Sequence, residues 1–146
     1  MARTYETIIL HCSATPPSMD IGAHVIDKWH RARGWAQCGY HYVIRRNGKI
    51  DRGRHISIQG AHAKGHNSYS IGICYVGGVD ENGKPEDNLT QQQRVAFVKL
   101  VGNLRRVFGT LNVVGHNDLP GVRKACPSFD TRVKFGEEFC NDEPAT

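Results

Sequence analysis

Two histidines and a cysteine stand where they could share one metal ion. His11 ends an apolar segment near the start of the chain, His116 ends another near its far end, and Cys126 follows ten residues later. Side chains at the ends of neighbouring strands meet in space, and two imidazoles with one thiolate leave one position of a tetrahedral zinc ion open, as in catalytic zinc sites. On spacing alone, two hydrogen-bonded strand-end histidines and a small buried cysteine explain the pattern equally well.

A second pair of histidines, His62 and His66, is spaced for a metal only if it lies on a helix. The neighbouring Gly60, Gly65 and Asn67 argue against a helix, so this pair is the weaker metal candidate. Residues 60–67 are typical of a loop, and a turn built on positive-φ glycines is the simpler interpretation of them.

Length and composition favour one soluble globular domain. The chain has 146 residues, of which 39% are hydrophobic and 23% are charged. We therefore expect a single domain over residues 1–146, with a core over about 5–139 and a frayed tail at 141–146. No apolar run reaches the roughly 20 residues that span a bilayer, and no signal-peptide pattern opens the chain, so we expect synthesis in a cytoplasm and no membrane partner.

The formal net charge of +5 favours an anionic partner, such as nucleic acid, a lipid surface or an acidic cell-wall polymer. The basic residues are scattered and form no zinc-finger or RNA-binding signature, which argues against direct nucleic-acid binding. The five cysteines are odd in number and include no C-x-x-C pair, so neither a disulfide scaffold nor a zinc ribbon is expected. The simplest interpretation of the other four cysteines is that they are reduced structural thiols; they are Cys12, Cys38, Cys74 and Cys140.

Apolar segments at residues 5–11, 70–76 and 111–115 predict three β-strands. Two more strands form a predicted hairpin over residues 42–54, because Asn47-Gly48 tolerates the positive φ angles of a two-residue turn.

Helical spacing predicts three helices among these strands. The first ends near Gly34, and its apolar face is expected to consist of Ile21, Val25 and Trp29. Residues 90–93 form a capping box that begins a long helix ending at Gly109, and Asp130 caps a last helix through residue 139. The alternating order predicts an α/β domain, with one central mixed β-sheet flanked by helices.

Six short blocks of sequence occur along the chain in a characteristic order. They are HCSAT at 11–15, GYHY at 39–42, GAHAKGHN at 60–67, SIGI at 70–73, GG at 77–78, and the segment from GH at 115–116 to KACP at 124–127. In these blocks the chain resembles the zinc-dependent N-acetylmuramoyl-L-alanine amidases. The resemblance covers about residues 11–129; it is strongest to the short lytic amidases, or endolysins, of T-odd phages, and extends to the animal peptidoglycan recognition proteins.

The resemblance implies that His11, His116 and Cys126 hold one zinc ion, and that Tyr40 and Lys124 are the catalytic side chains. Outside these motifs, a tyrosine before a strand is usually a packing residue and a lysine is usually solvated. Within them, Lys124 would stabilise the oxyanion of a tetrahedral intermediate, and Tyr40 would donate a hydrogen bond or relay a proton.

The family also implies a role for the loop at residues 60–67, which would line the substrate groove. His62 is then expected near the metal, and Lys64, His66 and Asn67 would hydrogen-bond the peptide or sugar of the substrate.

The function implied by the resemblance is hydrolysis of the amide between the lactyl group of N-acetylmuramic acid and L-alanine of the peptidoglycan stem peptide, which lyses the host cell. The enzyme would be made in the host cytoplasm and would act, as a monomer, on periplasmic or cell-wall peptidoglycan. The alternative is a recognition module that binds peptidoglycan without cutting it; such relatives typically lack the cysteine ligand, which is present here as Cys126. A compatible second role is inhibition of phage RNA polymerase.

Overall fold

The computed structural model describes residues 4–139 and contains one five-stranded sheet. The strands are β1 (Thr7–Cys12), β2 (Tyr42–Ile44), β3 (Ile50–Arg52), β4 (Ser70–Tyr75) and β5 (Asn112–Gly115). Their order across the sheet is β3-β2-β4-β1-β5, and only β3 runs antiparallel to its neighbour. The carboxyl ends of four parallel strands therefore share one edge, and the predicted mixed sheet is confirmed. The predicted tail at 141–146 and Cys140 lie outside the described residues.

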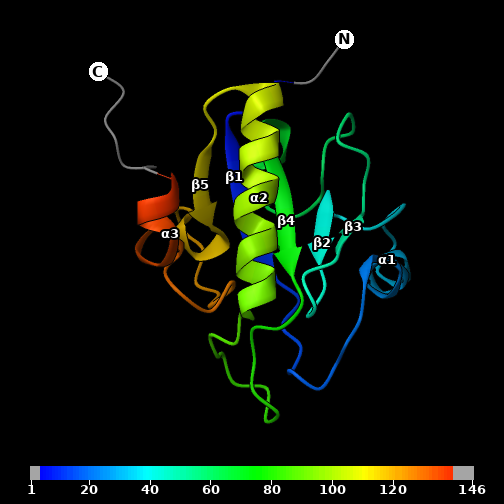
Figure 1. Cartoon of the computed structure of the whole chain (residues 1–146). Helices are drawn as coiled ribbons and strands as arrows, with labels where there is room; N and C mark the ends of the chain where they lie inside the picture. The colour runs from blue at the N-terminus through cyan, green and yellow to red at the C-terminus, as the bar shows by residue number, and fades with distance from the viewer. Residues whose placement is uncertain (1–3, 140–146) are drawn as a thin grey trace.

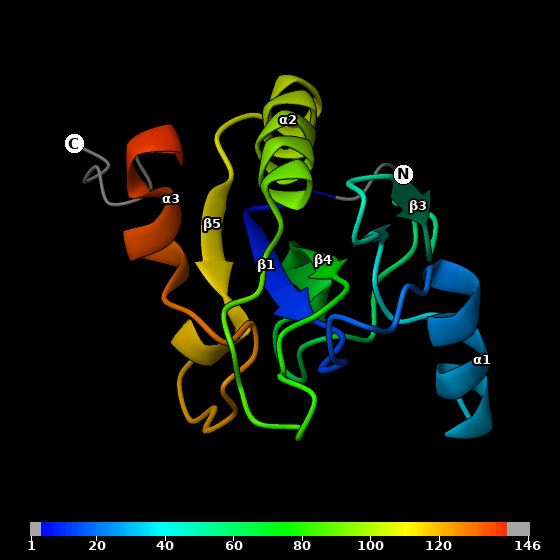
Figure 2. The ribbon, with the colours of Figure 1, turned by 60° about the horizontal axis from the view of Figure 1, so that its bottom comes forward.

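Three α-helices flank the sheet: α1 (Ala23–Ala32), α2 (Gln91–Phe108) and α3 (Thr131–Phe139). Figure 1 shows α2 crossing the sheet over β1 and β4, with α3 beside β5, and Figure 2 shows α1 set apart at the far end of the sheet. Within residues 4–139, no helix has the length and apolar composition needed to cross a membrane.

The two faces of the sheet are covered by different helices. On one face, Phe97 of α2 and Phe135 of α3 pack edge to face at 5.1 Å and belong to the main core with Ile8 and Leu10 of β1. On the other face, Ile26 of α1 packs in a smaller cluster with buried side chains of β2 and β4. Because successive side chains of a strand alternate between faces, His11 lies on the face opposite α2.

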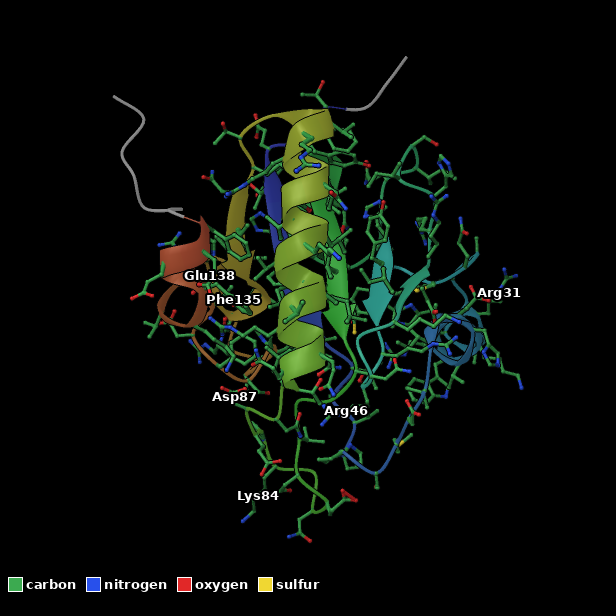
Figure 3. All side chains as sticks on the ribbon, in the orientation of Figure 1. Arg31, Arg46, Lys84, Asp87, Phe135 and Glu138 are labelled. Atoms are coloured by element: carbon green, nitrogen blue, oxygen red, sulfur yellow. The ribbon has the colours of Figure 1, made fainter. Side chains whose placement is uncertain are left out.

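The start of α2 is fastened to the sheet by Gln93, whose side chain is fully buried. Its amide nitrogen donates to the carbonyl oxygens of Ile44 (3.2 Å) and Val76 (2.9 Å), while its oxygen accepts from the backbone N–H of Thr90. The Thr90 hydroxyl accepts in turn from the Gln93 backbone, so the predicted capping box is confirmed. Arg46, which Figure 3 places at this end of α2, donates to the Val76 carbonyl at 3.0 Å.

The predicted apolar face of the first helix was wrong. The buried residues of α1 are Ala23, Ile26 and His30, whereas Trp29 is 38% exposed. The helix begins two residues after Ile21, and the contact of His30 with the loop that follows sets its rotation: the His30 Nδ1 accepts the backbone N–H of Gly39 at 2.8 Å.

The hairpin forms where it was predicted, but its turn is of another type. The N–H of Gly48 donates to the carbonyl of Arg45, which makes Arg46 and Asn47 the central residues, and of these positions only Gly48 has a positive φ, of 90°. The connection is therefore a three-residue loop, Arg46 to Gly48, rather than the predicted two-residue turn. Its last residue, Gly48, takes the left-handed conformation, so Asn47 does not need a positive φ.

Candidate active site

Three potential metal donors meet at the carboxyl edge of the sheet. His11 is the penultimate residue of β1, His116 directly follows the neighbouring strand β5, and Cys126 lies in the loop before α3. Their donor atoms lie within 4.8 Å of one another, and they form the single group of this kind among residues 4–139. The parallel pairing of β1 and β5 brings both histidines to one place although they are far apart in sequence.

Hydrogen bonds hold the Cys126 loop against the two strands. The backbone N–H of Asn117 donates to the Cys126 carbonyl at 2.9 Å, and the hydroxyl of Tyr75 donates to the Pro127 carbonyl at 2.6 Å. The backbone N–H of Cys12 points at the Cys126 sulfur at 3.1 Å. The Cys12 side chain and burial raise the pKa of the Cys126 thiol and this N–H lowers it by less, so the thiol loses its proton only when a metal binds.

The protonation states of the two histidines also suit a metal site. Burial lowers the pKa of His11 well below its usual value, with further lowering by His62, His116 and Lys124. Burial and Lys124 likewise lower the pKa of His116. Both rings are therefore neutral at neutral pH, and a neutral imidazole has a free lone pair for a metal.

The donor set fits a tetrahedral zinc ion. Zinc bonds of about 2.0–2.3 Å place tetrahedral donors roughly 3.3–3.8 Å apart, a spacing compatible with the close cluster of these three side chains. Three protein donors leave a fourth position for water or substrate, and the cluster opens into a cleft.

The cleft has a volume of about 660 Å³ and is lined by all three donors together with Tyr40 and Lys124. The Tyr40 ring lies 5.0 Å from the His11 ring. Burial raises the pKa of Tyr40 well above its usual value, so its hydroxyl remains protonated. Lys124 is exposed at the cleft wall and brings a positive charge near both histidines.

The four residues predicted to bind substrate occupy different environments. Lys64 and Asn67 line the cleft, but the Asn67 side-chain oxygen already accepts the backbone N–H groups of His62 and Ala63, both at 2.9 Å. His62 also lines the cleft, and its Nδ1 lies 2.9 Å from the Nε2 of His11. The ring of His66 contacts the Tyr69 hydroxyl and is not among the lining residues of this cleft.

Three lining residues lie outside the sequence blocks and were not predicted: His30, Arg33 and Trp35. The Trp35 ring lies 4.5 Å from the His30 ring and is 37% exposed. No local pattern marked Trp35 for this cleft, because its position there depends on how the segment after α1 packs.

The family model for N-acetylmuramoyl-L-alanine amidase matches residues 1–129. The chain therefore belongs to the N-acetylmuramoyl-L-alanine amidase family, as the sequence blocks predicted. The match covers all the metal donors and both predicted catalytic side chains.

Curated relatives and solved structures agree with this assignment. The chain is 44% identical to the endolysin of Enterobacteria phage K11 over 91% of this chain and 88% of that protein, and 40% identical to the endolysin of Escherichia phage T7 over 87% and 83%. Its fold is similar to that of the N-acetylmuramoyl-L-alanine amidase LysC from Clostridium intestinale, with a TM-score of 0.76, 27% identity, and coverage of 92% of this chain and 87% of that one.

Proposed function

We propose that this protein is a zinc-dependent endolysin that hydrolyses the amide between the lactyl group of N-acetylmuramic acid and L-alanine in peptidoglycan. The observation that carries the proposal is the convergence of His11, His116 and Cys126 at one end of a cleft that Lys124 borders. Membership of the amidase family and the similarity to phage endolysins support it.

Zinc bound to these donors would lower the pKa of a water molecule to about 7 and polarise the substrate carbonyl. The side chains around the donors supply the rest of an amide hydrolysis. The Lys124 ammonium, which lines the same cleft, would stabilise the negative charge that develops on the carbonyl oxygen. The Tyr40 hydroxyl, protonated at neutral pH, can donate a hydrogen bond to the reacting groups.

The cleft walls suit a charged, peptide-bearing polymer. Arg33 and Lys64 add positive charge to that of Lys124, and a peptidoglycan stem peptide carries carboxylates. Trp35 adds an exposed aromatic surface at the same cleft. This arrangement supports peptidoglycan as the substrate, and it gives the net charge of +5 a role at a wall polymer.

Other roles expected from the sequence remain predictions. Inhibition of phage RNA polymerase predicts reduced transcript yield when the protein is added to the cognate polymerase. A monomer in solution, synthesis in the host cytoplasm and action on the cell wall after release complete the proposed function. The recognition-module alternative predicts bound but uncleaved peptidoglycan; the intact donor set of His11, His116 and Cys126 favours catalysis instead.

The experiment that tests the proposal pairs metal analysis with mass spectrometry of digested peptidoglycan. We expect one zinc per chain and release of stem peptides that begin with L-alanine. Cys126→Ser should lose both zinc and activity, whereas Cys38→Ala, which removes a buried thiol outside the donor cluster, should retain both. Full activity of the metal-free protein, or cleavage at a sugar–sugar bond, would refute the proposal.

A further inference from the structure

His62 is held between a metal donor and a strand. Its Nδ1 lies 2.9 Å from the Nε2 of His11, with the two rings perpendicular and their centroids 5.0 Å apart. Its other nitrogen, Nε2, lies 3.3 Å from the Ser70 hydroxyl at the start of β4. Both ring nitrogens of His62 therefore face protein atoms.

The positions of the protons follow from counting donors. The Ser70 hydroxyl has one proton, which it donates to the His66 carbonyl at 2.6 Å, so toward His62 the Ser70 oxygen can only accept. This contact places the His62 proton on Nε2.

A neutral imidazole carries one proton, so the Nδ1 of His62 must be an acceptor. Within residues 4–139, the His62 ring contacts two other imidazoles and a hydroxyl and no carboxylate, so these surroundings favour the neutral ring. The contact at 2.9 Å then requires the Nε2 of His11 to be the donor. With its proton on Nε2, His11 has its free lone pair on Nδ1.

We propose that His62 is a positioning residue, which fixes the tautomer of His11 so that Nδ1, and not Nε2, is the atom that binds the metal. This inference rests on the proposed zinc site and assigns His62 to the metal donor rather than to the substrate. A partner of this kind orients the ligand ring and increases its basicity, and its loss typically weakens metal binding by about 10–100-fold.

The fold reserves a space for the His62 ring. A Cβ added at Gly72, in the middle of the apolar strand β4, would lie 2.5 Å from two carbon atoms of the ring, and one added at Gly60 would lie 2.7 Å from it. The ring of His41 borders the same space at 6.0 Å. His41 is itself fixed, because its Nδ1 accepts the Gly72 backbone N–H and its Nε2 bonds the Ile58 carbonyl. The absence of side chains at Gly60 and Gly72 is therefore what admits His62 beside His11.

The test compares three variants of the full chain. His62→Leu removes the acceptor with little change in volume, His62→Asn returns an oxygen acceptor near the position of Nδ1, and His24→Leu removes an exposed imidazole of α1 as the control. Zinc affinity is measured by competition with a chromophoric chelator. We expect His62→Leu to weaken zinc binding by about 10–100-fold, His62→Asn to recover most of that loss, and His24→Leu to match the wild type. The KM for peptidoglycan fragments should be unchanged in all three.

A second readout needs no variant and no activity. Long-range ¹H–¹⁵N correlation spectra of the wild-type protein report which ring nitrogen carries the proton, and we expect Nε2 for both His11 and His62. A proton on the Nδ1 of His11 would overturn the inference even if His62→Leu failed to fold. So would wild-type zinc affinity in a folded His62→Leu variant, or a raised KM with unchanged zinc affinity, which would mark a substrate contact. Failure of the wild type itself to bind zinc would instead refute the proposed function and this inference with it.

Discussion

The hydroxyl of Tyr75 joins the core of the sheet to the loop that carries Cys126, and Tyr75→Phe tests that connection. The Tyr75 ring is fully buried and stacks on Phe129 at 5.6 Å, while its hydroxyl donates to the Pro127 carbonyl at 2.6 Å. Burial raises the pKa of Tyr75 above its usual value, so the hydroxyl remains a donor in any ordinary buffer. The substitution keeps the ring and deletes only this donor.

The expected loss of stability in Tyr75→Phe comes from the Pro127 carbonyl, which the substitution leaves without its donor. The Pro127 carbonyl, adjacent to a metal donor, loses a buried hydrogen bond, and an unsatisfied buried group of this kind costs about 1–3 kcal/mol. For a chain of this size, each 1 kcal/mol lowers Tm by about 2–4 °C, so the Tm of the metal-free protein should fall by about 2–12 °C.

Differential scanning calorimetry measures this shift, with Tyr42→Phe as the matched control. Tyr42 lies half-buried in β2, and removal of its hydroxyl should change stability by less than about 0.5 kcal/mol. Equal shifts in the two variants, or no shift in Tyr75→Phe, would show that this hydrogen bond does not hold the loop.

Three further predictions concern the reaction, the fold and pH. Lys124→Ala should lower kcat by about 100-fold with little change in KM, because it removes oxyanion stabilisation; the exposed Arg123→Ala is the control, and equal losses in steady-state assays would contradict the assignment. Gln93→Ala should cost about 1–3 kcal/mol in urea unfolding, since the Thr90 N–H loses its acceptor and the Ile44 and Val76 carbonyls each lose one donor, whereas the exposed Gln92→Ala should be nearly neutral. The metal-ligand histidines and His62 have lowered pKa values in the folded state, so the unfolded state takes up more protons below about pH 6.5. The metal-free protein should therefore lose up to about 1.4 kcal/mol per pH unit for each such histidine as pH falls below that value, and a flat stability profile from pH 7 to 5 would contradict this.

Local signals were sufficient for most elements of the fold. The capping box at Thr90 and the apolar run of β4 each depend on neighbouring residues, so the sequence predicted them. The burial of His30 in α1 goes with a contact outside the helix, the hydrogen bond from the backbone of Gly39, which spacing along the helix does not reveal. The hairpin turn shows the same limit, because Asn47-Gly48 fits two turn types and the pairing of the strands decides between them.

In the candidate site too, the sequence identified some features and missed others. Strand ends and motif order were enough to single out His11, His116 and Cys126, because parallel neighbours deliver their last residues to one edge. The environment of His62 was not predictable, since it depends on the space left by Gly72 in a strand that is distant in sequence from His11. Only the assembled sheet brings these residues together.

The placement of the donors on the chain has a consequence for synthesis. β1 is made first yet lies in the sheet between β4 and β5, and Cys126 is separated from His11 by most of the protein. A ribosome-bound chain therefore lacks a complete donor set until Cys126 has emerged. Fragments that end before Cys126 contain the histidines but not the thiolate, so a chain cut short there has the two histidine donors without the third one.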